Sequence, residues 1–288
     1  MSHPKYSIII PVFNRPDEMR EMLDSLQLQT TKPFEIILVE DGSDQKSDFL
    51  INEYDLPIYY FYKSNTGPGD SRNFGMAKAN GDYFLFFDSD CVLPSDYFEQ
   101  LDKAISKAQP DAFGGPDAAH ESFSNVQKSI NYAMTSFFTT GGIRGGKKQL
   151  DKFQPRSFNM GLKKEVYEVI GGFSDIHPGE DPDLSFRIMR AGYKVSLIRE
   201  AIVFHKRRID FSKFIKQVYK FGVVRVILNQ WYPDTQKLVY FLPSAFFCGV
   251  ILLLAATIWL GNIVLLPLAV YAILIFPGRT SIQFPSGG

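Results

Sequence analysis

The chain has 288 residues, of which 45% are hydrophobic and 15% aromatic. This apolar content excludes an intrinsically disordered protein. Equal numbers of basic and acidic side chains, 31 of each, exclude a strongly basic nucleic-acid binder, so we expect no nucleic-acid partner. Two cysteines, Cys91 and Cys248, are too few for a disulfide framework, which indicates a reducing compartment.

Short apolar runs alternate with amphipathic stretches over the first two hundred residues. The apolar runs are typical of strands covered on both faces, and Pro, Asn and Gly mark the helix ends. This alternation predicts an α/β fold with an open, mostly parallel sheet and right-handed crossovers. In chain order, the predicted elements are strand 6–10, helix 16–29, strand 34–39, strand 58–62, helix 70–79, strand 83–87, a helix from about 181 to 191, and strand 201–204.

Polar side chains follow these strands at their carboxyl ends, where open parallel sheets bind ligands. Asn14 follows the first strand, Asp41 follows the second, and Asp88 and Asp90 follow strand 83–87. Because Asp88 and Asp90 are two positions apart in extended backbone, both carboxylates face one side and could bind a hard divalent cation. A turn or a helix cap is the alternative interpretation of an Asp-x-Asp pair.

A second acidic cluster begins a predicted helix far along the chain. It contains Glu180, Asp181 and Asp183, and the helix that follows has an apolar stripe. Asp is a preferred N-cap residue, so capping is one interpretation. However, three acids exceed what capping needs, and a carboxylate at the edge of a cleft can act as a general base toward a hydroxyl.

The C-terminal third separates into a basic stretch and an uncharged one. Residues 203–240 hold eight Lys or Arg and two Asp among apolar residues at helical spacing. This pattern predicts amphipathic helices on an anionic cytoplasmic leaflet. No charged residue occurs from Phe241 to Phe276, and Gly261 divides this run into a span of transmembrane length, 242–260, and a shorter piece, 263–276.

Buried core helices are the alternative to a membrane segment, but a soluble helix pair does not need two uniformly apolar faces. The basic stretch beside the span places the N-terminal domain in the cytoplasm, at the inner membrane. The predicted domains are therefore 1–205, a catalytic-type α/β domain; 206–240, basic interfacial helices; and 241–288, one or more transmembrane segments.

Six motifs in a fixed order carry a family resemblance, and as a set they are specific although each alone is weak. They are Ser7 to Asn14, Ile37 to Ser43, Asn65-Thr66-Gly67, Arg72-Asn73, Phe87 to Asp90, and Gly172-Phe173 through Glu180 to Leu184. The set resembles the family 2 glycosyltransferases, inverting enzymes with the GT-A fold, over about residues 5–214. The resemblance implies a GT-A domain, and the uncharged run adds C-terminal transmembrane helices to it.

The resemblance also implies roles for individual residues. Asp181 would be the catalytic base, with Glu180 and Asp183 on the acceptor side. Asp90 and Asp88 would bind Mg²⁺ or Mn²⁺, with His205 as a further candidate ligand; an ordinary hydrogen-bonded histidine is the alternative. The residues that would bind the donor, a nucleoside-diphosphate sugar, are Pro11, Val12, Asn14, Asp41, Arg72, Asp88 and Ser89.

We therefore expect inverting transfer of a single sugar to a polyprenyl- or lipid-linked glycan acceptor at the membrane. Processive synthases of this broad family carry Gln-x-x-Arg-Trp, but residues 217–221 read Gln-Val-Tyr-Lys-Phe, which argues against polymer synthesis. The alternatives are a nucleotidyltransferase and a non-catalytic membrane protein that binds nucleotide sugars. A glycine-rich segment, 141–148, lacks the Ser or Thr of a phosphate-binding loop, so we interpret it as a basic loop beside the cleft.

Overall fold

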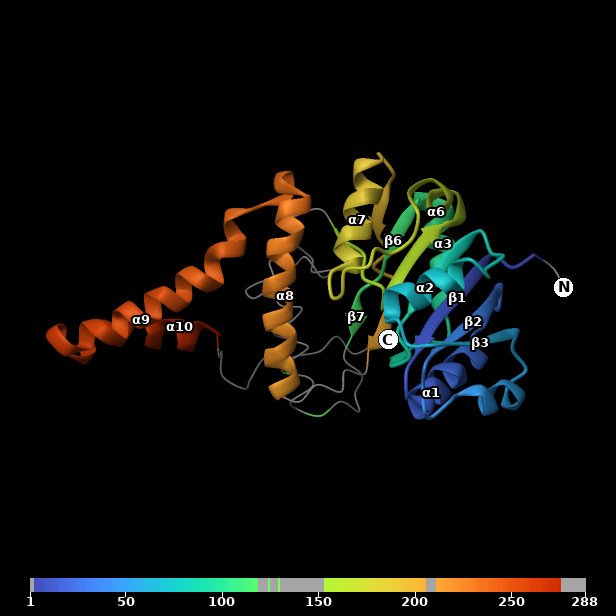
Figure 1. Ribbon diagram of the computed structural model, residues 1–288, viewed down its shortest axis with the longest axis horizontal. Helices are drawn as coiled ribbons and strands as arrows, with labels where there is room; N and C mark the ends of the chain where they lie inside the picture. Colours follow the sequence, from blue (N-terminus) through green and yellow to red (C-terminus); the bar gives the residue numbers. More distant parts are fainter. Residues whose placement is uncertain (1–2, 119–123, 125–128, 130–152, 206–210, 276–288) are drawn as a thin grey trace. The chain divides into compact units, whose positions relative to one another are not determined.

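The computed structural model describes residues 3–118, 124, 129, 153–205 and 211–275 (Figure 1). Two compact units make up the chain, residues 1–228 and 229–288. The glycine-rich segment 141–148 and the basic residues 206–208 lie outside the described residues, so the interpretation of both stays a prediction.

A seven-stranded sheet forms the centre of the first unit, in the order β3-β2-β1-β4-β8-β6-β9. Neighbouring strands are parallel except at β8, which is antiparallel to both β4 and β6. The mostly parallel sheet expected from the sequence is therefore confirmed. Its strands are β1 (Tyr6–Val12), β2 (Phe34–Asp41), β3 (Ile58–Lys63), β4 (Tyr83–Phe87), β6 (Ala112–Gly114), β8 (Asn159–Lys163) and β9 (Val195–Leu197).

A second, three-stranded sheet joins distant parts of the first unit in the order β5-β10-β7. Its strands are β5 (Cys91–Val92), β7 (Asp117–Ala118) and β10 (Val203–His205). In the antiparallel pairing of β10 with β5, His205 lies opposite Cys91. This pairing brings a histidine from the end of the domain beside the Asp-x-Asp motif.

Helices cover both faces of the large sheet (Figure 1). Because successive side chains of a strand point to opposite faces, Ile8 and Ile10 belong to one core cluster and Ile9 to the other. The described helices of this unit are α1 (Pro16–Gln27), η1 (Asp48–Glu53), α2 (Pro68–Met76), α3 (Tyr97–Ala108), α6 (Lys164–Ile170) and α7 (Glu180–Arg190). Helix α8 (Phe211–Trp231) belongs to this unit as far as Leu228.

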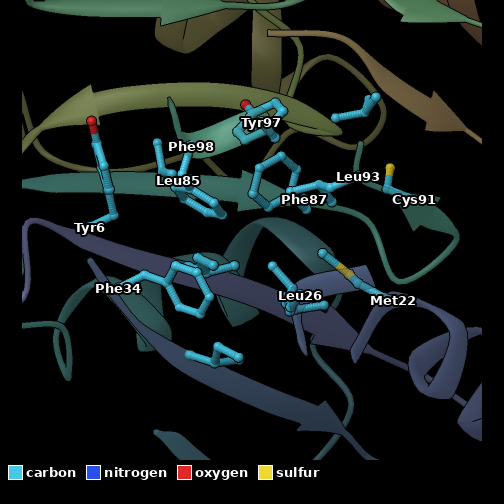
Figure 2. Packing of buried hydrophobic residues seen from close by; sticks show 14 of the residues in the cluster. Tyr6, Met22, Leu26, Phe34, Leu85, Phe87, Cys91, Leu93, Tyr97 and Phe98 are labelled. Atoms are coloured by element: carbon cyan, nitrogen blue, oxygen red, sulfur yellow. The ribbon is translucent and has the colours of Figure 1, made fainter. Parts of the chain in front are cut away.

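The first cluster packs α1 and α3 against one face of the sheet (Figure 2). Phe98 of α3 lies 4.6 Å from Phe34 of β2, measured between ring centroids, and Met22 and Leu26 of α1 are buried in the same cluster. The second cluster contains Met76 of α2, Val166 of α6 and Leu184 of α7. The site-forming helices α2 and α7 are therefore anchored on the same side of the sheet.

The second unit is helical. Its helix α9 (Leu242–Leu260) has the bounds predicted for the span, and its mean hydropathy of 2.1 and exposed surface make it the one helix among the described residues long and apolar enough to cross a membrane. The expectation of more than one such helix is not confirmed, because α10 has only ten residues. The remaining elements are η2 (Pro233–Thr235), η3 (Leu238–Phe241), η4 (Asn262–Leu265) and α10 (Leu266–Ile275).

Candidate active site

A cavity of about 800 Å³ lies at the carboxyl ends of the parallel strands in the first unit. Its volume is in the range of sites that bind small molecules. It brings together ten of the twelve residues expected at the site, from segments up to 194 positions apart: Pro11, Val12, Asp41, Arg72, Asp88, Ser89, Asp90, Glu180, Asp181 and His205. Asn14 and Asp183 do not line it.

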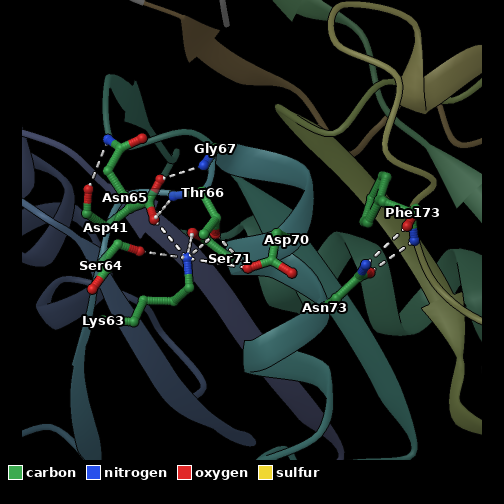
Figure 3. A network of polar contacts seen from close by, with 10 residues as sticks. All are labelled: Asp41, Lys63, Ser64, Asn65, Thr66, Gly67, Asp70, Ser71, Asn73 and Phe173. Atoms are coloured by element: carbon green, nitrogen blue, oxygen red, sulfur yellow. Dashed lines mark hydrogen bonds and ion pairs between the residues drawn. The ribbon is translucent and has the colours of Figure 1, made fainter.

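Asp41 is the last residue of β2 and is held rigidly (Figure 3). One of its carboxylate oxygens, Oδ1, lies 2.6 Å from Lys63 Nζ and accepts the Thr66 N–H at 3.0 Å; the other, Oδ2, accepts the Gly67 N–H at 2.9 Å. Both partners of the ion pair are shielded, since the side chains of Lys63 and Asp41 are 14% and 5% exposed. Charge-assisted hydrogen bonds of this kind fix a carboxylate in one orientation.

Lys63 was not among the site residues expected from the sequence. It ends β3, so the rule that led to Asp41, which inspects the carboxyl edge of each strand, would also have found it. Lys63 also lies 3.1 Å from Asp70, and this second carboxylate belongs to the first turn of α2. Lys63 therefore connects β2, β3 and the start of α2.

Arg72 connects the two acidic motifs. Its side chain is 3% exposed, its Nη2 donates to Asp88 Oδ1 at 2.7 Å, and its Nη1 lies 3.8 Å from Glu180 Oε1. His177 Nδ1 lies 3.0 Å from the same Glu180 oxygen. Burial raises the pKa of Glu180, but the hydrogen bond to His177 and the charge of Arg72 outweigh it and lower the pKa below its ordinary value.

Two basic side chains, Arg15 and His205, contact Asp90. Arg15 Nη1 lies 3.0 Å from its Oδ2, and His205 Nε2 lies 3.0 Å from its Oδ1. Burial raises the pKa of Asp90, yet His205 and then Arg15 together lower it below its ordinary value. Arg15 was not expected at the site from the sequence, although it follows Asn14 at the carboxyl end of β1.

The donor set around Asp90 fits a divalent cation. Asp90 Oδ1 is buried and lies 3.0 Å from His205 Nε2, but no hydrogen bond from the described residues satisfies it. Adjacent ligands of an octahedral Mg²⁺ site, bound at about 2.1 Å, are separated by roughly 3 Å. Cys91 is the third member of this cluster, but burial raises the pKa of its thiol, and the thiol donates to the Phe158 carbonyl instead.

Asp181 begins helix α7, immediately after Glu180. Its Oδ1 is buried, with no hydrogen bond to any residue that the structure describes. Burial raises the pKa of Asp181, Glu180 raises it further, and the opposing charge of Arg72 is too weak to cancel these effects. A carboxylate with a raised pKa and an unpartnered oxygen in a cavity has the properties of a general base.

Two sets of hydrogen bonds hold the loop before α7. Asn73 of α2 forms paired hydrogen bonds of 2.8 Å with the backbone of Phe173 (Figure 3). Arg187 donates to the carbonyls of Ile170 and Gly172 at 2.9 and 2.6 Å. Asp183 holds Arg187 in this position, with 3.0 Å between its Oδ2 and Arg187 Nε.

Two expected site residues therefore have another position in the structure. Asp183 is 2% exposed and clamps Arg187 rather than facing the cavity, because helical geometry turns it away from Asp181. Asn14 adopts a positive φ of 54°, and its Oδ1 accepts the backbone N–H groups of Asp44 and Gln45 at 2.8 and 2.9 Å. Asn14 thereby joins the loop after β1 to the loop after β2.

Helix α8 supplies one wall of the cavity, beside the acidic helix start. Phe221, Val224 and Leu228 line it, and the last two are 8% and 1% exposed. The opposite surface of α8 exposes Ile215 and Tyr219, at 54% and 73%. A helix expected from the sequence only as a membrane-surface element therefore also shapes the site.

Comparison with solved structures identifies the class of fold. The structure superposes on the mannosyltransferase PcManGT of Pyrobaculum calidifontis, in complex with GDP-Man and Mn²⁺, with a TM-score of 0.70 at 15% identity, covering 96% of this chain and 81% of that one. It superposes on residues 1–349 of TarS from S. aureus, in complex with UDP-GlcNAc, with a TM-score of 0.56 at 17% identity, covering 78% and 66%. The fold is the α/β GT-A fold of such glycosyltransferases.

The family follows from the sequence. The model of glycosyl transferase family 2 matches residues 7–171, more than half of the chain, so the chain belongs to this family. It is 45% identical over 87 residues to an uncharacterized glycosyltransferase of Rickettsia typhi, covering 30% of this chain and 27% of that protein. It is 38% identical over 110 residues to glycosyltransferase GlyA of Streptococcus pneumoniae, covering 37% and 16%. The chain thus matches less than a third of the length of either relative.

Proposed function

We propose that this chain transfers a single sugar, with inversion, from a nucleoside-diphosphate sugar to a lipid-linked acceptor at the membrane. One observation carries the proposal: a single cavity is lined by both acidic motifs, the pair Asp88 and Asp90 and the pair Glu180 and Asp181. This arrangement allows a leaving group to be stabilised at one end and an attacking hydroxyl to be deprotonated at the other.

The donor binds across the carboxyl ends of β1 and β2, with Pro11, Val12, Asp41, Arg72 and Ser89 among its contacts. Among the residues that the structure describes, Gly67 alone donates to Asp41 Oδ2, and a carboxylate oxygen has two lone pairs. It can therefore accept an N–H of the nucleobase without losing its own support. Lys63 and the backbone N–H groups hold this acceptor in place before the donor arrives.

The diphosphate binds beside the Asp-x-Asp motif. A divalent cation, Mg²⁺ or Mn²⁺, held by Asp90 and Asp88 together with His205, would neutralise the negative charge of the leaving diphosphate. The 3.0 Å separation between the buried Asp90 Oδ1 and His205 Nε2 supports this ligand set. Arg72 keeps Asp88 oriented through the 2.7 Å hydrogen bond.

Asp181 acts as the base. Its free Oδ1 accepts the proton of an acceptor hydroxyl while the hydroxyl oxygen attacks the anomeric carbon. The new glycosidic C–O bond forms as the C–O bond to the diphosphate breaks, and the displaced diphosphate leaves on the opposite face. A single displacement of this kind inverts the anomeric centre, and Glu180 lies beside Asp181 on the acceptor side.

A membrane-associated acceptor is supported by the composition of two helices. The length, apolar sequence and exposure of α9 support a membrane span. Helix α8 exposes apolar side chains together with Lys216 and Lys220, a combination typical of helices at an anionic membrane surface. The excess of basic residues beside α9 favours a catalytic unit on the cytoplasmic side of the inner membrane.

The test is the release of nucleoside diphosphate from a donor, with Mn²⁺, when a lipid extract is added as acceptor. We expect Asp181→Asn to abolish release while leaving donor binding, measured by thermal shift, close to that of the wild type. Asp175→Asn is the control, because Asp175 is exposed and outside the cavity. Pyrophosphate release would indicate a nucleotidyltransferase, and donor binding without any release would indicate a binding protein.

A further inference from the structure

Two arginines contact the Asp-x-Asp motif, and their side chains differ in how far they are buried. Arg72 is 3% exposed and is fixed between Asp88 and Glu180. Arg15 reaches Asp90 from the other side with a side chain that is 44% exposed, although Asp90 itself is only 10% exposed. Arg15 can therefore leave Asp90 without disturbing the protein core, whereas Arg72 cannot leave Asp88.

The backbone that carries Arg15 is fixed, so any movement is confined to the side chain. Arg15 precedes Pro16 at the start of α1, and its carbonyl accepts the Met19 N–H at 3.1 Å. The preceding residue, Asn14, is tied to the loop after β2 through its own N–H, which donates to Ser43 Oγ at 2.7 Å, and through its side chain. A long, flexible cation is thus anchored at the edge of the cavity that it lines.

The position of Arg15 conflicts with a divalent cation on the same carboxylate. Its Nη1 lies 3.0 Å from Asp90 Oδ2, while Oδ1 of the same group faces His205. A guanidinium that neutralises Asp90 lowers the attraction of Asp90 for a second cation, and two cations sharing one carboxylate repel each other. A nearby diphosphate offers Arg15 a better partner, because the guanidinium fork matches phosphate oxygens.

We propose that Arg15 is a mobile counter-ion: it neutralises Asp90 while the site holds no donor, and moves to the diphosphate when a divalent cation takes its place. This inference rests on the proposed function. Arg15 would couple cation binding to donor binding, because the cation binds weakly until a diphosphate accepts the arginine. After bond cleavage, the same contact would stabilise the leaving diphosphate.

The test measures Mn²⁺ binding by the full chain in detergent, from the electron paramagnetic resonance signal of the free ion. Without donor, Arg15→Gln should bind Mn²⁺ roughly threefold to tenfold more tightly than the wild type, because a competing charge is removed. With nucleoside diphosphate present, the gain should disappear or reverse, since the variant lacks a phosphate contact. Arg15→Lys keeps the charge, so its affinity without donor should stay close to that of the wild type.

Arg20→Gln is the matched control, since Arg20 lies on α1, the helix that Arg15 precedes, is 42% exposed and pairs with Glu53 outside the cavity. Weaker or unchanged Mn²⁺ binding by Arg15→Gln without donor would overturn the inference. Asp90→Asn separates this failure from that of the proposed function. If Asp90→Asn leaves Mn²⁺ binding unchanged, the metal site itself is misassigned, whereas a loss of binding leaves only the role of Arg15 in question.

Discussion

The ion pair of Lys63 and Asp41 provides the most quantitative prediction. Removing one partner of a buried ion pair costs about 3–5 kcal/mol, because the other charge stays buried. Asp41 retains the N–H groups of Thr66 and Gly67, and hydrogen bonds to a charged group offset about 1–2 kcal/mol. We therefore expect Lys63→Met to lower the free energy of unfolding by about 2–3 kcal/mol.

A double-mutant cycle isolates the interaction itself. In Asp41→Asn/Lys63→Met no buried charge remains, so the double variant should be at least about 1 kcal/mol more stable than additivity predicts. Urea unfolding, followed by near-ultraviolet circular dichroism, measures the four stabilities. Lys103→Met is the control: Lys103 pairs with Glu99 at a distance of 2.8 Å, but both are exposed, and such pairs contribute about 0–1 kcal/mol.

Hydrogen exchange adds a local measurement. The amides of Thr66 and Gly67 donate to Asp41, so they should exchange faster in Lys63→Met while amides in α3 do not change. Additive effects of the two substitutions, or a loss no larger than that of Lys103→Met, would refute the argument that Lys63 fixes Asp41.

Two further predictions concern the acidic cavity. Glu180→Gln should move the acidic limb of the pH profile of kcat/KM to lower pH. The proposed base, Asp181, must be deprotonated to act, and its pKa is raised by burial and then by the negative charge of Glu180. Removing the charge of Glu180 therefore lowers the pKa of Asp181. An acidic limb that stays in place or moves upward would contradict this coupling. His205→Ala should weaken Mn²⁺ binding by roughly 10- to 100-fold, measured by the free-ion signal, and an unchanged affinity would leave His205 a structural residue stacked on Phe158.

Helices and strands with a distinctive local sequence pattern were predicted correctly. The strand 83–87 and the helix 242–260 have the predicted bounds, because five consecutive apolar residues define the first and Gly261, which interrupts the uncharged run, ends the second. The helix predicted at 70–79 instead begins at Pro68, since a proline is well suited to the first turn. These elements are defined by nearest neighbours in the sequence.

Long-range pairing was harder to predict. The antiparallel strand β8 inserts between β4 and β6, yet its sequence, Asn-Met-Gly-Leu-Lys, has no distinctive pattern. His205 reaches Asp90 only because the short strands β10 and β5 pair, with His205 opposite Cys91, 114 positions earlier in the chain. Spacing in the sequence contains no information on such a pairing.

The site residues likewise divide into those that local sequence patterns predicted and those that depend on long-range contacts. Carboxylates at strand ends were found because the edge rule of parallel sheets applies to them directly. Lys63 and Arg15 occupy equivalent edge positions, but their partners, Asp41 and Asp90, come from other strands. Asp183 was grouped with Asp181 by proximity in sequence, whereas the helix directs it toward Arg187.

The most direct test of the whole account is diffraction from crystals grown with Mn²⁺ and the nucleoside-diphosphate sugar that stabilises the protein most in a thermal-shift screen. The account predicts an anomalous Mn²⁺ peak between Asp90 Oδ1 and His205 Nε2, with the anomeric carbon of the donor facing Asp181. A peak elsewhere, or a donor sugar directed away from Asp181, would contradict it.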